Sequence, residues 1–240
     1  MKAIKNFLIQ TISNLPAHDF SFTLIESIKY NNWFYNEAMY SYCLTDKVLD
    51  KVFLDYVPIG SVEFVLDFLK QYHDINGIKP LHIPKQLMKP DYLKRSCYIS
   101  NKEDIKLNKA KFIKNIDKIK SYTEISDNIN AAPEGNYFVS DIVEIDSEWR
   151  SFVYNNELVG LQNYLGDFTL FPCVELIKKM IADYNYSYPY TLDVGINSNG
   201  TFILECHDFF SCGLYGFADH RILPKMFITT YRKIINCLSN

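Results

Sequence analysis

The 240-residue sequence has no long apolar run and no large excess of charge of either sign. Its hydrophobic stretches are broken by Asp, Lys or Asn within a few positions, short of the roughly 20 apolar residues that span a bilayer. The net charge of -3 gives no basic field for nucleic acid or an anionic membrane. Near the start, Asn6, Gln10 and Asn14 interrupt the apolar residues, unlike in a secretory signal. We expect a soluble, cytoplasmic protein with neither partner.

Closely paired cysteines are also missing. The six cysteines are scattered, and a chain of this size folds without disulfides, so we expect reduced thiols (Cys43, Cys97, Cys173, Cys206, Cys212, Cys237). Cys206, His207, Cys212 and His220 lie close in sequence but lack the CxxC spacing of structural zinc sites. Burial in and beside a strand is therefore the favoured interpretation over zinc.

The common nucleotide and hydrolase motifs are absent as well. The chain contains no GxxxxGK[ST] or GxGxxG, and no GxSxG or HExxH. Any phosphate binding must therefore come from lysine, arginine, a metal and the backbone, and not from a glycine-rich loop.

What the sequence does contain is the pattern of a folded α+β protein, with 48% apolar and 22% charged residues. The segment GSVEFVLDFL predicts a helix that begins near Val62 with Ser61 as its N-cap. Helical spacing returns in FPCVELIKKMIADYN and LPKMFITTYRKIINCL. After the proline-rich passage of residues 75–95, strand character appears in RSCYIS, AKFIKNI, NYFVSDIVEI, EWRSFVYNNELVGLQNYL, TLDVGIN and TFILECHDFF.

These elements predict a domain built around antiparallel strands with flanking helices. The proline-rich passage suggests a boundary near residue 90, with an N-terminal substrate- or partner-recognition part at 1–90 and the main domain at 91–240. Residues 21–55 support only a mixture of helix and strand.

Two carboxylates occur on neighbouring predicted strands. A hairpin turning at Asn199 and Gly200 places Asp193 and Glu205 at a similar level. Adjacent acids in apolar strands repel each other unless a cation compensates, and hard oxygen donors suit Mg²⁺, with Asp208 as a further donor. The alternative is that one acid faces solvent and the pair never meets.

Two cations stand out among the predicted strands. Alternation in AKFIKN puts Lys114 on the face opposite Ile113, where its ammonium could meet phosphate oxygens or simply be solvated. Arg150 lies between Trp149 and Phe152, which implies burial beside an anionic partner. That partner could be a phosphate, or Glu148 or Glu205 in a structural salt bridge.

Taken in order, GSVEF, KIKS and EWR resemble the short ATP-grasp families of bacteria and phages. The resemblance covers roughly the last two thirds of the chain and is most specific from EWRSF to GLYGF. It implies a two-lobed ATP-grasp fold with ATP between the lobes, and a hinge near residues 139–145. The first 55 residues match no part of that pattern.

The resemblance also implies roles for individual residues. Lys114 and Lys120 would approach the phosphates or adenine of ATP, and Asp141 and Val143 would line the adenine pocket. Arg150 would act on the phosphates or an acyl phosphate, so that Arg150 and Lys120 are the predicted catalytic residues.

By the same resemblance, Asp193 and Glu205 would hold Mg²⁺, and Ser211 and Gly213 would line the acceptor site. The pattern usually has Asn two positions after the metal-binding glutamate, where this chain has His207 followed by Asp208. Because imidazole is a poor ligand for Mg²⁺, Asp208 is the predicted substitute.

The implied activity is ATP-dependent ligation of a small-molecule or peptide carboxylate to an amine through an acyl phosphate, releasing ADP and phosphate. Two alternatives stay open. One is an ATP-dependent phosphotransferase, and the other is a non-catalytic ATP-grasp module that binds a partner through aromatic side chains, which are 15% of the residues.

Overall fold

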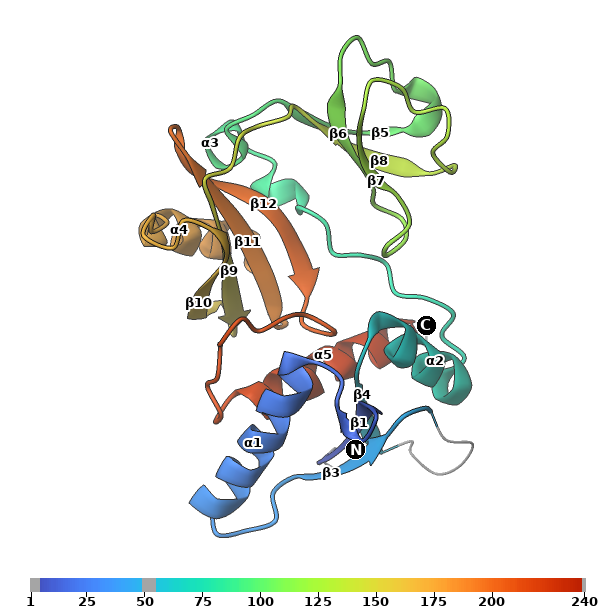
Figure 1. Ribbon diagram of the computed structural model, residues 1–240, viewed down its shortest axis with the longest axis vertical. Coiled ribbons are helices and arrows are strands. Elements are labelled where there is room, and N and C mark those ends of the chain that lie inside the picture. The colour runs from blue at the N-terminus through green and yellow to red at the C-terminus, as the bar shows by residue number, and fades with distance from the viewer. Residues whose placement is uncertain (1–4, 49–54, 239–240) are drawn as a thin grey trace. The chain divides into compact units, whose positions relative to one another are not determined.

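The computed structural model describes residues 5–48 and 55–238. Contacts divide the chain, whose ribbon is drawn in Figure 1, into two compact units. Unit 1 comprises residues 1–77, 187–190 and 208–240, and unit 2 comprises residues 78–186 and 191–207. The first change of unit falls between Gly77 and Ile78, whereas the predicted boundary lies near residue 90. The C-terminal residues return to the unit that contains the N-terminal ones.

Unit 1 is built on a small sheet whose main strands are parallel. The central strand β1 (Asn6–Ile12) pairs in parallel with β3 (Ser41–Thr45) and β4 (Tyr56–Ile59), and antiparallel with the short β2 (Leu15–Pro16). Consecutive β1 residues Phe7, Leu8 and Ile9 are fully buried, as expected for a parallel strand covered on both faces. The sequence patterns had not indicated this sheet.

Three helices complete unit 1: α1 (Asp19–Phe34), α2 (Val62–His73) and α5 (Leu223–Leu238). The helix predicted from Val62 is confirmed, and the Ser61 side chain accepts a hydrogen bond of 3.2 Å from the Phe64 backbone N–H. Helix α5 contacts α1 and β4, although they are far apart in sequence. None of the helices in the described parts of the chain is long and apolar enough to cross a membrane.

Unit 2 contains two four-stranded sheets, the first of which is antiparallel with strand order β5-β8-β6-β7. It is formed by β5 (Cys97–Asn101), β6 (Lys111–Asn115), β7 (Thr123–Ser126) and β8 (Asn136–Ser140). Ile113, Tyr137 and Val139 are fully buried in its core. Short helical segments precede or follow β5: η1 (Lys85–Leu87), α3 (Pro90–Leu93) and η2 (Lys102–Asp104).

The second sheet has the order β10-β9-β11-β12. It consists of β9 (Ser147–Tyr154), β10 (Glu157–Gly166), β11 (Tyr190–Asn197) and β12 (Gly200–Asp208). Asn155 and Asn156 both have positive φ, which a two-residue hairpin turn requires, and join β9 to β10. The predicted turn at Asn199 and Gly200 likewise connects the neighbours β11 and β12. Helix α4 (Val174–Tyr184) contacts β10 (Figure 1).

One predicted strand is shorter in the structure. NYFVSDIVEI forms a strand only to Ser140, and residues 141–145 have no regular structure before β9. Both ladders of β8 end at this residue, where Ser140 faces Cys97 on β5 and Phe112 on β6. Without a partner strand, apolar residues beyond this point cannot continue the sheet.

Candidate functional site

Unit 2 contains a cavity of about 300 Å³. Its apolar wall is formed by side chains from the first sheet, the 141–145 linker and β12 (Phe112, Ile125, Phe138, Ile142, Val143, Ile145, Leu204). Polar and charged side chains share the lining (His82, Arg95, Lys114, Ser140, Asp141, Glu148, Tyr164, Glu205). A cavity that combines an apolar wall with convergent polar groups is a usual form of a small-molecule site.

Lys114 lies where the strand alternation predicted. Ile113 is fully buried in the core, whereas Lys114 on the other face of β6 lines the cavity. Its ammonium forms an ion pair with Glu205 Oε2 on β12. The lysine is therefore neither buried in the core nor simply solvated, and it lies next to one of the two predicted metal-binding carboxylates.

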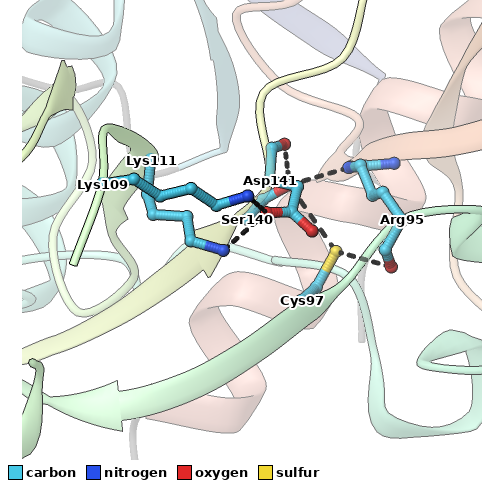
Figure 2. A network of polar contacts seen from close by, with 6 residues as sticks. All are labelled: Arg95, Cys97, Lys109, Lys111, Ser140 and Asp141. Carbon is cyan, nitrogen blue, oxygen red and sulfur yellow. Dashed lines mark hydrogen bonds and ion pairs between the residues drawn. The ribbon is translucent and has the colours of Figure 1, made fainter. Parts of the chain in front are cut away.

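A polar network holds the beginning of the 141–145 linker (Figure 2). Arg95 Nε donates to Ser140 Oγ at 2.9 Å, and Lys111 Nζ donates to Asp141 Oδ1 at 2.5 Å. Lys109 Nζ lies 3.5 Å from the same Asp141 oxygen. The hydrogen bond and charge of Lys111 lower the pKa of the Asp141 carboxyl, so it is ionised at neutral pH. The predicted adenine-pocket residues Asp141 and Val143 both line the cavity.

The two carboxylates predicted to converge do so, and a histidine joins them. One ligand atom each of Asp193, Glu205 and His207 lie within 4.8 Å of one another. Glu205 and His207 are two residues apart on β12 and so share a face, and His207 Nε2 lies 2.7 Å from Glu205 Oε1. The alternative in which the two acids never meet is wrong.

Arg150 has an anionic partner, as its burial required, and that partner is Asp193. The guanidinium binds the carboxylate with both arms, Nε to Oδ1 at 2.9 Å and a terminal nitrogen to Oδ2 at 2.7 Å. Both side chains are almost completely buried, with 9% and 1% exposed. Glu148, one of the two partners expected for a salt bridge, instead accepts a 2.6 Å hydrogen bond from the Tyr164 hydroxyl.

The two carboxylates differ in their electrostatic environment. Burial raises the pKa of Asp193, and the Arg150 guanidinium opposes that effect. Burial would also raise the pKa of Glu205, but hydrogen bonds and charge from His207 and Lys114 outweigh it and lower that pKa well below its usual range. Glu205 is therefore the firmly ionised acid of the pair, and the more accessible one, at 28% exposure.

The family model of the ATP-grasp domain, R2K clade family 2, matches residues 84–224, which is more than half of the chain. The chain belongs to this ATP-grasp family. The matched residues include all three members of the acid and histidine cluster. They also include the whole cavity lining with the exception of His82. No curated protein matches the chain.

Solved structures show the same fold. The chain is similar to D-alanine–D-alanine ligase from Bacillus anthracis, with a TM-score of 0.55, 10% identity, and coverage of 98% of this chain and 99% of that one. It is also similar to a RimK domain ATP-grasp protein from Sphaerobacter thermophilus, with a TM-score of 0.53, 13% identity, and coverage of 98% of this chain and 100% of that one. A third similar structure is N5-carboxyaminoimidazole synthetase from Staphylococcus aureus complexed with ADP. Its TM-score is 0.55 and its identity 9%, and the match covers 95% of this chain and 77% of that one. The predicted ATP-grasp fold of the α+β class is confirmed.

Two predicted site residues of this ATP-grasp domain lie elsewhere. Lys120 is exposed in the loop between β6 and β7, with φ of 54°, and is not one of the cavity-lining residues. Asp208 adjoins His207 on β12 and so projects to the opposite face, where it is 5% exposed and paired with Lys233 of α5. His207, which the sequence argument set aside as a poor Mg²⁺ ligand, is the third member of the cluster.

Several cavity residues have no clear signal in the sequence. His82 and Arg95 lie in or beside the proline-rich passage, where no periodicity indicates which side chains are buried. Arg95 bridges the two sheets, because it donates to Ser140 Oγ and, at 2.8 Å, to the Ile203 carbonyl. Only its position between Leu93 and the strand-like CYIS could have suggested partial burial.

Proposed function

We propose that this protein is an ATP-dependent ligase that joins a carboxylate to an amine through an acyl phosphate, releasing ADP and phosphate. The observation that carries the proposal is the convergence of Asp193 and Glu205 with Lys114 at the edge of an apolar cavity. Membership of the ATP-grasp family supports it, and so do the names of two structurally similar proteins, a D-alanine–D-alanine ligase and an N5-carboxyaminoimidazole synthetase.

In this proposal the cavity takes the adenine of ATP. Its apolar wall would contact both faces of the base, and Asp141 and the backbone near Val143 would offer polar partners at its edge. Lys114 lies on the same wall, next to Glu205, where its charge would meet phosphate oxygens. Lys120 remains a predicted phosphate contact, but the loop between β6 and β7 would have to move for its side chain to reach the cavity.

The acid cluster fits a divalent cation such as Mg²⁺. Asp193 and Glu205 offer oxygen donors within 4.8 Å of each other, and Mg²⁺ commonly takes one or two protein carboxylates together with substrate phosphates. When bound, the cation supplies positive charge that offsets the developing charge on the terminal phosphates. Asp208, the further donor predicted from the sequence, projects to the opposite face of β12 and is paired with Lys233.

The chain's own groups then have separable tasks. Lys114 and Arg150 would offset phosphate charge while the substrate carboxylate attacks the γ-phosphorus, forming the acyl phosphate and ADP. An amine would next attack the acyl carbon and displace phosphate, with Arg150 stabilising charge on the oxygen. Arg150 also binds both oxygens of Asp193 and opposes the effect of burial on its pKa. No step requires a covalent nucleophile from the protein.

The first test is a thermal-shift titration with ATP and Mg²⁺. A ligand at about 100 times its Kd adds about 2.7 kcal/mol, which should raise the Tm by roughly 5 to 10 °C. Glu205→Gln should lose most of this shift. Glu134→Gln, which neutralises an exposed glutamate paired with Lys102, is the matched control and should retain it.

Product analysis then separates the ligase from the other two functions. ADP formation that needs both a carboxylate and an amine supports ligation. A stable phosphorylated acceptor formed without an amine would replace the ligase by a phosphotransferase. Absence of any Tm shift in the folded wild-type protein would favour the non-catalytic module.

A further inference from the structure

We propose that His207 is a direct metal ligand beside Glu205, and that this metal site therefore favours Mn²⁺ over Mg²⁺ more strongly than a site built of oxygen donors alone. The inference rests on the proposed function, because it concerns the cation that accompanies ATP. It assigns to His207 a role that the sequence argument had given to Asp208.

The geometry places the imidazole nitrogen correctly for this role. Two ligand atoms about 2.1 Å from one ion at a right angle are about 3 Å apart. His207 Nε2 and Glu205 Oε1 are 2.7 Å apart, and the donor atom of Asp193 lies within 4.8 Å of both. One ion can therefore contact all three side chains after only small movements.

The charges around the cluster leave these donor atoms usable. Lys114 binds Oε2 of Glu205, whereas His207 faces the other oxygen, Oε1. Arg150 occupies both oxygens of Asp193, but each carboxylate oxygen has a second lone pair. His207 is 36% exposed, so its ring is accessible to a nucleotide-bound cation.

The donor set decides the metal preference. Mg²⁺ strongly prefers oxygen ligands, whereas imidazole binds transition metals, and Mn²⁺ accepts both nitrogen and carboxylate donors. Replacing an oxygen donor by imidazole thus weakens binding of Mg²⁺ relative to Mn²⁺. Asp208 cannot take the place of His207 on this face of β12, because adjacent residues of a strand project to opposite sides.

The competing role for His207 is indirect. Its ring could hold Glu205 by a hydrogen bond without touching the ion, as outer-shell partners of metal ligands do. That arrangement would also make His207 important for metal affinity. A test must therefore detect the metal–nitrogen bond itself and not only a change in affinity or activity.

The experiment uses the full-length protein labelled with ¹⁵N-histidine, Mn²⁺ and a non-hydrolysable ATP analogue. Pulsed electron paramagnetic resonance should detect ¹⁵N coupling to bound Mn²⁺ in the wild type and in His220→Asn, whose parent ring contacts Ser27 of unit 1. The coupling should be absent in His207→Asn. The Mn²⁺-to-Mg²⁺ affinity ratio, measured by competition, should fall on the order of tenfold in His207→Asn, the scale on which site changes alter metal affinity.

The outcomes distinguish this inference from the proposed function. Mn²⁺ that binds with the analogue and depends on Glu205, yet shows no ¹⁵N coupling, would overturn the direct role of His207 and leave the proposed function intact. Absence of any Mn²⁺ binding by the folded protein would overturn both. An unchanged Mn²⁺-to-Mg²⁺ ratio in His207→Asn would contradict the claimed preference, and the Tm of each variant confirms that it is folded.

Discussion

The buried ion pair between Arg150 and Asp193 is the residue-scale feature on which the acid cluster depends. Desolvating two charges is costly, and the two-armed geometry and mutual attraction offset that cost. A buried pair of this kind is weak evidence for stability but strong evidence that neither partner can be removed alone. In this domain it also holds the side chain of Asp193 beside those of Glu205 and His207.

Removal of one partner of this ion pair should therefore lower the free energy of unfolding more than removal of both. We expect Arg150→Met to lower the free energy of unfolding by about 3 to 5 kcal/mol, because it leaves Asp193 buried without a counter-charge. The double variant Arg150→Met, Asp193→Leu should recover most of that loss. Urea unfolding of the nucleotide-free protein measures both, and equal losses in the single and double variants would contradict the argument.

His82 gives the stability a pH dependence. Burial, followed by the nearby charge of Lys114, lowers its pKa from 6.5 to about 4. Below pH 6.5 the unfolded chain takes up a proton that the folded protein does not, so stability falls as the pH decreases through that window. The contribution of His82 should decrease by about 2 kcal/mol between pH 7.5 and 5.0.

The variant His82→Gln isolates this contribution. Urea unfolding at pH 7.5 and at pH 5.0 should show a smaller loss of stability in His82→Gln than in the wild type. If both proteins lose the same free energy over this range, the imidazole is not the group that titrates. His82 Nε2 is buried and has no hydrogen-bond partner among the described residues, so Gln at this position need not break a bond to that nitrogen.

At the scale of elements, the start of helix α2 is set by a local signal, whereas the end of strand β8 is not. The beginning of α2 was predictable because an N-cap serine bonds within its own first turn, and Ser61 does so. The end of β8 was not, because it depends on where the antiparallel partner strands β5 and β6 begin. Its continuation in sequence, IVEI, is as apolar as the strand itself.

The cap of α2 can be tested directly. Ser61→Ala should destabilise the protein by about 1 kcal/mol, because the Phe64 backbone N–H loses its acceptor. Ser61→Asp keeps an acceptor oxygen and should remain within a few tenths of a kcal/mol of the wild type. The measurement is the midpoint of urea unfolding, and an equal loss in the two variants would show that the cap bond is not the cause.

At the scale of the whole molecule, unit 1 is assembled from separate segments of the chain. Helix α5 contributes buried apolar side chains to the unit that contains the N-terminal residues, among them Leu223, Met226 and Phe227. Phe20 on α1 packs against Phe227 with ring centroids 6.4 Å apart. An organisation into consecutive N- and C-terminal parts would not require these contacts.

A shortened chain tests this organisation. A chain that ends at His207 should leave unit 1 without its α5 packing, so residues 1–77 should become sensitive to protease and lose cooperative unfolding. A chain that ends at Leu238 is the control and should resist protease like the full chain. If residues 1–77 remain protected without α5, they fold on their own and the predicted division near residue 90 gains support.

The sequence by itself determined the elements whose signals are local: the Ser61 cap, the hairpin at Asn199, and the periodic helices α4 and α5. It also placed Lys114 opposite Ile113 and brought Asp193 to Glu205, because strand alternation and a short turn fix those positions. Only the tertiary structure decided that Arg150 pairs with Asp193, that His82 and Arg95 line the cavity, and that α5 joins the N-terminal unit. These contacts join residues far apart in sequence, and no local periodicity specifies such pairings.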